Sequence, residues 1–112
     1  MKTVFHLVQS DEQGRKTTLT IADNLTEDDT VEMEAIAVVA QADGAEPVTA
    51  GGTGSEQVES LLEKGVSVKV CSNTMELKEL DESDLVDGVE TVSSGAAELT
   101  RLQADDYAYV RP

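Results

Sequence analysis

The chain has 112 residues, which is the usual size of one domain, so we expect a single domain over residues 1–112. Its formal net charge is −15, from 23 acidic and 8 basic side chains, and such a surface repels phosphate groups and anionic lipid. The composition therefore excludes nucleic acid and membrane surfaces as expected partners.

The acidic residues are spread over the whole chain and do not form a tail. A dispersed acidic surface with few lysines is typical of adaptation to high salt, where the Debye length falls to about 3 Å and self-repulsion is screened. We therefore expect a halophilic, archaeal source. Intrinsic disorder is the alternative that high net charge also favours, but the regular apolar periodicity of the chain argues against it.

A single cysteine cannot form an internal disulfide, which fits a reducing compartment. The N-terminus enters an apolar strand-like run without a charged segment, a long hydrophobic segment or a cleavage site, so no secretory signal is expected. No apolar run approaches the ~20 residues that cross a bilayer. These features predict a cytoplasmic protein.

The first third of the chain predicts a strand, a helix and a second strand. Residues 3–8 form a short apolar run of the kind that is buried on both faces of a sheet. Residues 11–25 place three apolar side chains near one face of a helix. Residues 31–40 alternate polar and apolar side chains and then become wholly apolar, which predicts the second strand.

The middle of the chain predicts a helix followed by a third strand. Thr53 and Glu56 have the spacing of a capping box, so a helix is expected to open near Ser55. Gly65 occupies the position that follows a helix C-terminus, where a left-handed conformation is common. Residues 66–71 then alternate valine with polar residues, as a half-buried strand does.

The last third of the chain continues the alternation. Asn73 and Glu76 again have capping-box spacing, which predicts a short helix through Leu80. The remaining segments are an acidic turn at residues 81–88, a strand at 89–92, a helix after residues 93–95, and a final strand at 107–110. The final strand could be antiparallel or lie at an edge of the sheet.

Strands and helices that alternate in this way predict an α/β fold, with a mostly parallel sheet and helices on both faces. In open parallel sheets, ligands bind at the carboxyl ends of the strands. Four loops of this chain reach that edge, and we expect any functional site among them. They are residues 9–11, 41–54, 71–73 and 93–95.

Cys71 is the residue best placed for chemistry. It closes a strand just before a predicted helix N-terminus, where unpaired N–H groups and the helix dipole stabilise a thiolate. Lys69 shares its face if the strand stays regular, whereas Glu76 and Glu79 oppose a second negative charge. The alternative is a buried cysteine that acts as a small hydrophobic residue, and position alone favours neither.

Three other features are weaker candidates. His6 could move a proton or orient a thiol, but a buried histidine with satisfied hydrogen bonds is the favoured interpretation. The glycine-rich loop 51–54 could hold an anion through backbone N–H groups, although a flexible connection is favoured. Ser94 and Gly95 are similarly ambiguous, and a helix cap and turn are favoured.

Residue content argues against several classes of protein. The chain has no CxxC pair, so dithiol exchange within one chain is excluded. One histidine and one cysteine do not suggest a zinc site, and loop 51–54 is neither a P-loop nor a dinucleotide fingerprint. The loops lack the aromatic residues that flank a flavin, and no nucleophile–base pair can be located. We expect no metal and no cofactor.

Short motifs in a characteristic order span nearly the whole chain. They are Val4-Phe5-His6, Asn24-Leu25, Gly65-Val66, Cys71-Ser72-Asn73-Thr74, Val92-Ser93-Ser94-Gly95 with Glu98-Leu99, and the closing Tyr107-Ala108-Tyr109-Val110-Arg111-Pro112. In this order they resemble the DsrE/DsrF-like family, which includes YchN-like proteins. The resemblance implies a three-layer α/β/α, flavodoxin-like fold around a mostly parallel five-stranded sheet, assembled as homotrimers or hexamers.

The resemblance also implies that some members carry sulfur as a cysteine persulfide and pass it between partner proteins. The expected function is therefore a sulfur carrier in a sulfur relay, with donor and acceptor proteins as partners and no turnover of its own. The alternative is a non-catalytic ligand-binding or assembly module with an inert cysteine. The candidate site consists of Cys71 as the sulfur-carrying residue, supported by Asn73, Thr74, His6, Ser94 and Gly95.

Overall fold

The computed structural model describes all 112 residues and contains one five-stranded sheet. All neighbouring strands are parallel, and their order across the sheet is β4-β3-β2-β1-β5. The predicted sheet is confirmed, and its final strand proves to be parallel, at the edge beside β1. The strands are β1 (Lys2–Leu7), β2 (Ala35–Ala40), β3 (Ser67–Cys71), β4 (Glu90–Val92) and β5 (Tyr107–Val110).

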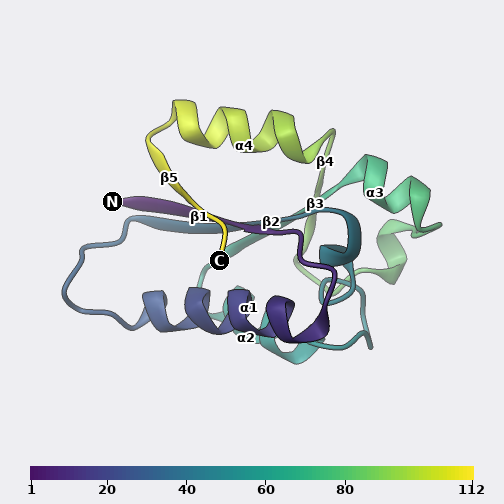
Figure 1. Cartoon of the computed structure of the whole chain (residues 1–112), viewed down its shortest axis with the longest axis horizontal. Coiled ribbons are helices and arrows are strands. Elements are labelled where there is room, and N and C mark those ends of the chain that lie inside the picture. The colour runs from purple at the N-terminus through teal and green to yellow at the C-terminus, as the bar shows by residue number, and fades with distance from the viewer.

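Helices cover both faces of the sheet, which gives three layers (Figure 1). Helices α1 (Glu12–Thr26) and α2 (Ser55–Glu63) lie together on one face, and α4 (Gly95–Ala104) lies on the other. Right-handed crossovers explain this, because the chain steps from β1 to β4 in one direction and α4 then crosses back to β5. Shorter elements lie near the carboxyl edge: α3 (Ser72–Leu77) and the 3-10 turns η1 (Ala42–Ala45) and η2 (Glu82–Asp84).

Alternation along β1 gives each face of the sheet its own apolar cluster. Phe5 and Leu7 belong to the larger cluster, which also contains Leu19 of α1. Val4 belongs to the smaller cluster, where it packs with Leu99 of α4. A strand covered on both faces has to be apolar on both, which is why central β2 consists of alanine, valine and isoleucine alone.

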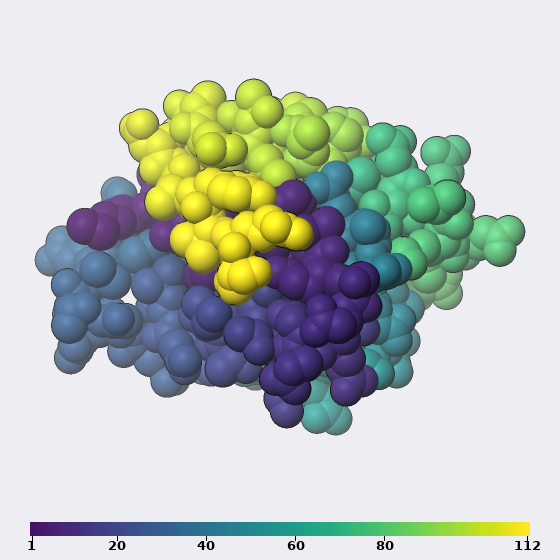
Figure 2. Space-filling view, viewed as in Figure 1, coloured from purple at the N-terminus to yellow at the C-terminus, as the bar shows by residue number.

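The C-terminal segment closes one edge of the sheet. Strand β5 pairs with β1 from Tyr107 opposite Lys2 to Val110 opposite Phe5. Figure 2 shows this segment, in yellow, crossing the surface between α4 and the N-terminal part of the chain. Because it is an edge strand, Tyr109 remains 41% exposed. No helix of the protein has the length and apolarity to cross a bilayer.

The second strand is shorter than predicted. It begins at Ala35 instead of residue 31, because the adjacent strand β1 begins at Lys2, directly opposite Ala35. Strand residues need a hydrogen-bonded neighbour, and residues 31–34 have none in the sheet. The N-terminus itself bonds this segment, through the Met1 carbonyl that accepts from the Glu34 N–H at 2.8 Å.

Both predicted capping boxes are wrong. Helix α2 follows Gly54, which has φ 95° and no side-chain cap, so Thr53 is not the capping residue. Helix α3 follows Cys71 directly, so Asn73 lies within its first turn. The predicted stop at Gly65 is confirmed, since its φ is 87° and its N–H donates to a carbonyl in the last turn of α2.

Candidate functional site

Three of the four predicted loops meet around Cys71 at the carboxyl edge of the sheet. The Ser72 hydroxyl donates to the Ser93 carbonyl at 3.1 Å, which joins the ends of β3 and β4. The Ala42 N–H donates to the Thr74 hydroxyl oxygen at 3.0 Å, which joins the end of β2 to α3. The loop after β1 instead contacts α1 and the C-terminus.

Cys71 is buried at the end of β3. The residue is 3% exposed, yet neither apolar cluster includes it. A cysteine that served packing alone would be expected to lie among apolar side chains. Its surroundings are polar groups at the starts of two helices, so the side chain lies where its charge state can matter.

The pKa of the Cys71 thiol is lowered by these polar groups. Burial raises the pKa, but the opposing effect is greater, and the pKa falls below that of an ordinary cysteine. The backbone N–H groups of Thr74, Gly95 and Asn73, together with the Thr74 hydroxyl, stabilise the ionised sulfur. The Cys71 side chain makes no capping hydrogen bond at the start of α3.

These donors are available because they lie in the first turns of α3 and α4. The first N–H groups of a helix have no acceptor within the helix. Two helix starts therefore supply free N–H groups to one point, beside a strand end that carries a thiol. Helix α3 has only six residues, so of the two factors predicted from the sequence, the unpaired N–H groups account for the effect better than the helix dipole.

The supporting residues predicted from the sequence differ in what they contribute. Thr74 is buried and offers both its N–H and its hydroxyl to the sulfur. Asn73 contributes its backbone N–H, while the residue is exposed. Ser94 caps α4, because its hydroxyl oxygen accepts from the Ala97 N–H at 3.0 Å, whereas the next residue, Gly95, presents its own N–H to the sulfur.

His6 lies near the carboxyl end of β1, closer to the sheet edge than its sequence position suggested. Its Nε2 is 2.6 Å from the Gln41 amide oxygen, and its Nδ1 is 2.5 Å from the Tyr109 hydroxyl. An amide oxygen can only accept, so Nε2 carries the proton, and in the neutral ring Nδ1 accepts from Tyr109. Both ring nitrogens thus have hydrogen-bond partners, as the favoured interpretation required, although His6 is half-buried where that interpretation had it buried.

Gln41 was missed by the sequence-based reasoning. It follows the last residue of β2, and its side chain lies directly against Gly95, where a Cβ atom would be 2.3 Å from the Gln41 Cδ. Gln41 therefore connects His6 to the residue whose N–H faces Cys71. Its position after a buried strand was the one available signal, because its partners are distant in sequence.

Lys69 shares a face of β3 with Cys71, but its charge is paired with Glu98. Its Nζ is 2.5 Å from a carboxylate oxygen of Glu98 on α4, and Arg101 binds the other oxygen at 3.0 Å. The hydrogen bond from Lys69 is the main reason why the pKa of Glu98 is lowered, against the effect of burial. This ion pair joins α4 to β3.

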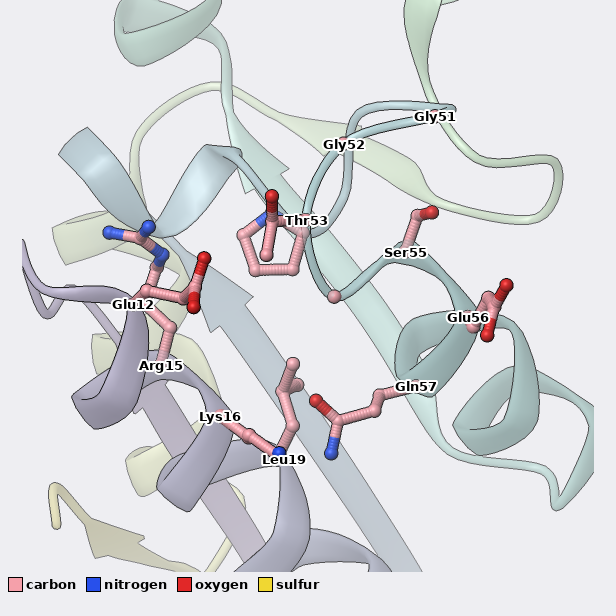
Figure 3. Close-up of a pocket in the computed structure, with 12 residues that line it drawn as sticks. Glu12, Arg15, Lys16, Leu19, Gly51, Gly52, Thr53, Ser55, Glu56 and Gln57 are labelled. Carbon is pink, nitrogen blue, oxygen red and sulfur yellow. The ribbon is translucent and has the colours of Figure 1, made fainter.

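The glycine-rich loop 51–54 borders a separate cavity of about 500 Å³, between the N-terminal parts of α1 and α2 (Figure 3). Its lining carries both signs of charge, with Glu12, Arg15 and Lys16 on α1 and Glu56 on α2. None of the groups that face the thiol sulfur lines this cavity. No group of three or more histidine, cysteine, aspartate or glutamate side chains is arranged to hold a metal ion.

The protein has a parallel α/β sheet with a thiol at its carboxyl edge, among the N–H groups of two helix starts. It is therefore a small α/β protein with a candidate thiol site. The chain belongs to the DsrE/DsrF-like family, whose sequence description matches residues 2–112. The resemblance seen in the sequence motifs is therefore confirmed. No significant match was found among curated proteins.

Solved structures with the same fold cover the chain from end to end. A protein of unknown function, MTH1491 from Methanobacterium thermoautotrophicum, is 33% identical with a TM-score of 0.91, covering 99% of this chain and 98% of its own. The ychN protein from E. coli is 18% identical with a TM-score of 0.85, covering 100% and 99%. The conserved protein BT1422 from Bacteroides thetaiotaomicron, of unknown function, is 12% identical with a TM-score of 0.80, covering 99% and 94%. The last two likenesses concern the fold alone.

Proposed function

We propose that this protein is a sulfur carrier that holds a persulfide on Cys71 and passes it between partner proteins. The observation that carries the proposal is a buried thiol at the carboxyl edge of the sheet, beside the first turns of α3 and α4, whose N–H and hydroxyl groups lower its pKa. A thiolate attacks sulfane sulfur, whereas a thiol does not do so effectively. Membership of the DsrE/DsrF-like family supports the same chemistry.

The transfer needs no cofactor and no change in the total number of electrons. The Cys71 thiolate attacks the outer sulfur of a donor persulfide, a new S–S bond forms on Cys71, and the donor S–S bond breaks to release the donor thiolate. An acceptor thiolate then attacks the outer sulfur on Cys71 and releases the Cys71 thiolate. The donors from Thr74 and Gly95 stabilise the anionic sulfur before the first transfer and after the second.

The burial of Cys71 sets a condition on both transfers. With 3% of the residue exposed, a partner reaches the sulfur only if the turn at the start of α3 moves or is displaced by docking. Asn73 and Ser93 are exposed beside the thiol, so a partner that docks here meets them first.

Intact mass spectrometry after incubation with glutathione persulfide in high-salt buffer tests the proposal. We expect the protein to gain one sulfur atom, to lose it again in dithiothreitol, and to gain none as Cys71→Ser. A matched control, Cys71→Ser with Ser72→Cys, keeps one thiol but moves it one residue, and should take up less sulfur. A folded wild-type protein that gains no sulfur would end the carrier proposal.

The second candidate function is a non-catalytic module that binds a small ligand or serves assembly, with Cys71 inert. The cavity beside loop 51–54 favours it, because that cavity lies away from the thiol and combines basic and acidic side chains with exposed backbone. The rate of alkylation of Cys71 as a function of pH separates the two candidates. A midpoint at or above that of an ordinary cysteine would favour the inert module.

Oligomerisation as a homotrimer or hexamer is part of the proposal. Leu77 on α3 is 81% exposed and Met1 is 68% exposed, and large exposed apolar side chains gain burial when copies associate. Light scattering coupled to size-exclusion chromatography in molar KCl measures the mass. A monomer at micromolar concentration would contradict this part of the proposal.

We also propose a cytoplasm rich in salt, in a halophilic archaeon, as the setting of the protein. Most of the 23 carboxylates lie outside the ion pairs of the structure, so their mutual repulsion opposes folding when counterions are scarce. The melting temperature is expected to rise by several degrees between millimolar and molar KCl. Superimposable melting curves over that range would contradict adaptation to salt.

A further inference from the structure

We propose that Gln41 and Ala42 form a positioning turn for Cys71, and that His6 anchors this turn by its hydrogen bond to Gln41. This inference rests on the proposed function, because it concerns how the thiolate used in sulfur transfer is held. Gln41 and His6 are positioning residues, since neither is among the groups that face the sulfur.

The Thr74 hydroxyl is held by the backbone of Ala42. Its oxygen accepts from the Ala42 N–H at 3.0 Å, so its hydrogen remains free for another acceptor. The same hydroxyl is one of the groups that lower the pKa of Cys71. Ala42 has φ 51°, a left-handed conformation that a residue with a Cβ atom seldom adopts. The surrounding structure therefore fixes the direction of this N–H, and with it the direction of the hydroxyl.

The Gln41 side chain restricts the position of Gly95. The Gln41 side chain lies so close to Gly95 that a Cβ there would come within 2.5 Å of three of its atoms. The Gln41 carboxamide therefore limits where the first residue of α4 can lie. Because the Gly95 N–H faces the sulfur, the position of the carboxamide sets how well that donor reaches Cys71.

The Gln41 carboxamide is itself held by His6. The Gln41 oxygen accepts from His6 Nε2 at 2.6 Å, and His6 Nδ1 is held by the Tyr109 hydroxyl at 2.5 Å. The Gln41 backbone N–H also donates to the Leu7 carbonyl at 3.0 Å. Residues of β1 and β5 thus hold Gln41 in place. Loosening any of these contacts would allow the Thr74 hydroxyl and the Gly95 N–H to move.

The test is the pH profile of Cys71 alkylation by iodoacetamide in Gln41→Met, with Gln103→Met as the matched control. Methionine retains bulk over Gly95 but cannot accept from His6, whereas Gln103 is exposed on α4. We expect the midpoint of Gln41→Met to move to higher pH and its rate at neutral pH to fall by about threefold to tenfold. The control should keep the wild-type profile.

A folded Gln41→Met variant with the wild-type profile would overturn the inference, even if its melting temperature had fallen. If that variant does not fold, Tyr109→Phe removes the hydroxyl that holds His6 from the edge strand, and a midpoint unchanged from wild type would overturn it equally. Alkylation requires no sulfur donor. A wild-type protein that takes up no sulfur but shows the shift in Gln41→Met would therefore end the carrier proposal and leave the positioning turn standing.

Discussion

Replacing Lys69 by methionine is expected to lower the free energy of unfolding by about 3 kcal/mol at neutral pH, because it leaves a buried carboxylate with a weakened set of partners. The side chains of Lys69 and Glu98 are 18% and 9% exposed, so water can compensate only in part. Arg101 remains beside Glu98 but is itself 59% exposed. Urea unfolding followed by circular dichroism measures the loss.

The same variant should be less affected in acid. The pKa of Glu98 is lower in the folded protein than its unfolded value near 4.5, so the pair contributes its full stability above that pH. This contribution is lost as the pH falls through the folded-state pKa. The difference between wild type and Lys69→Met is therefore expected to be greatest at neutral pH and to shrink as the pH falls below about 4.5.

Lys64→Met is the matched control for this experiment. Lys64 binds Asp23 and Glu27, but these carboxylates are 39% and 70% exposed, and surface pairs of this kind contribute less than about 1 kcal/mol. Adding Glu98→Gln to Lys69→Met should recover part of the loss, since it removes the isolated charge. Equal losses in Lys64→Met and Lys69→Met would show that burial of the pair is unimportant.

Replacing Gly44 by alanine is expected to cost about 3 kcal/mol, at the upper end of the usual range for overpacking. A Cβ at this position would lie 1.9 Å from the Leu7 carbonyl oxygen and 2.6 Å from its carbon. Both are backbone atoms, so η1 would have to move away from the end of β1. The Leu7 carbonyl also accepts from Gln41, so the shift should raise the midpoint of Cys71 alkylation as well.

Gly65→Ala measures the destabilisation that a left-handed backbone causes without a steric clash. Gly65 has φ 87°, but no atom lies within 4 Å of the place that an alanine methyl group would occupy. Its replacement should therefore cost only the left-handed penalty of about 1 kcal/mol. Gly44→Ala tests the opposite case, since its cost comes from the close approach alone. Chemical unfolding of both variants gives the comparison, and a smaller loss in Gly44→Ala would contradict the expected order.

The periodicity of the sequence predicted most of the elements. The apolar run at residues 3–8 predicted β1, because a strand that is covered on both faces has to be apolar on both. The closing strand Tyr107–Val110 was also predicted. Gly65 was evident because a left-handed helix stop favours glycine. The start of β2 was misplaced because it depends on where β1 begins, which is a property of strand pairing.

The candidate site was predicted only in part. Position alone identified Cys71, since a strand end followed by a helix start is a local pattern. The donors to its sulfur come from α3 and from Gly95, and the second of these required β3 and β4 to be neighbours. Spacing suggested that Asn73 capped α3, but the chain turns into the helix directly after Cys71.

The sequence by itself determined the class of fold, the acidic surface, the single thiol and its place at a strand end, because each depends on composition or on local periodicity. Only the tertiary structure decided which side chains meet. His6 and Tyr109 are 103 positions apart, and His6 and Gln41 are 35 apart, so no local pattern relates them. Their contact depends on β1 lying between β2 and β5. That strand order follows from the packing of whole helices on the two faces of the sheet, which no short stretch of sequence encodes.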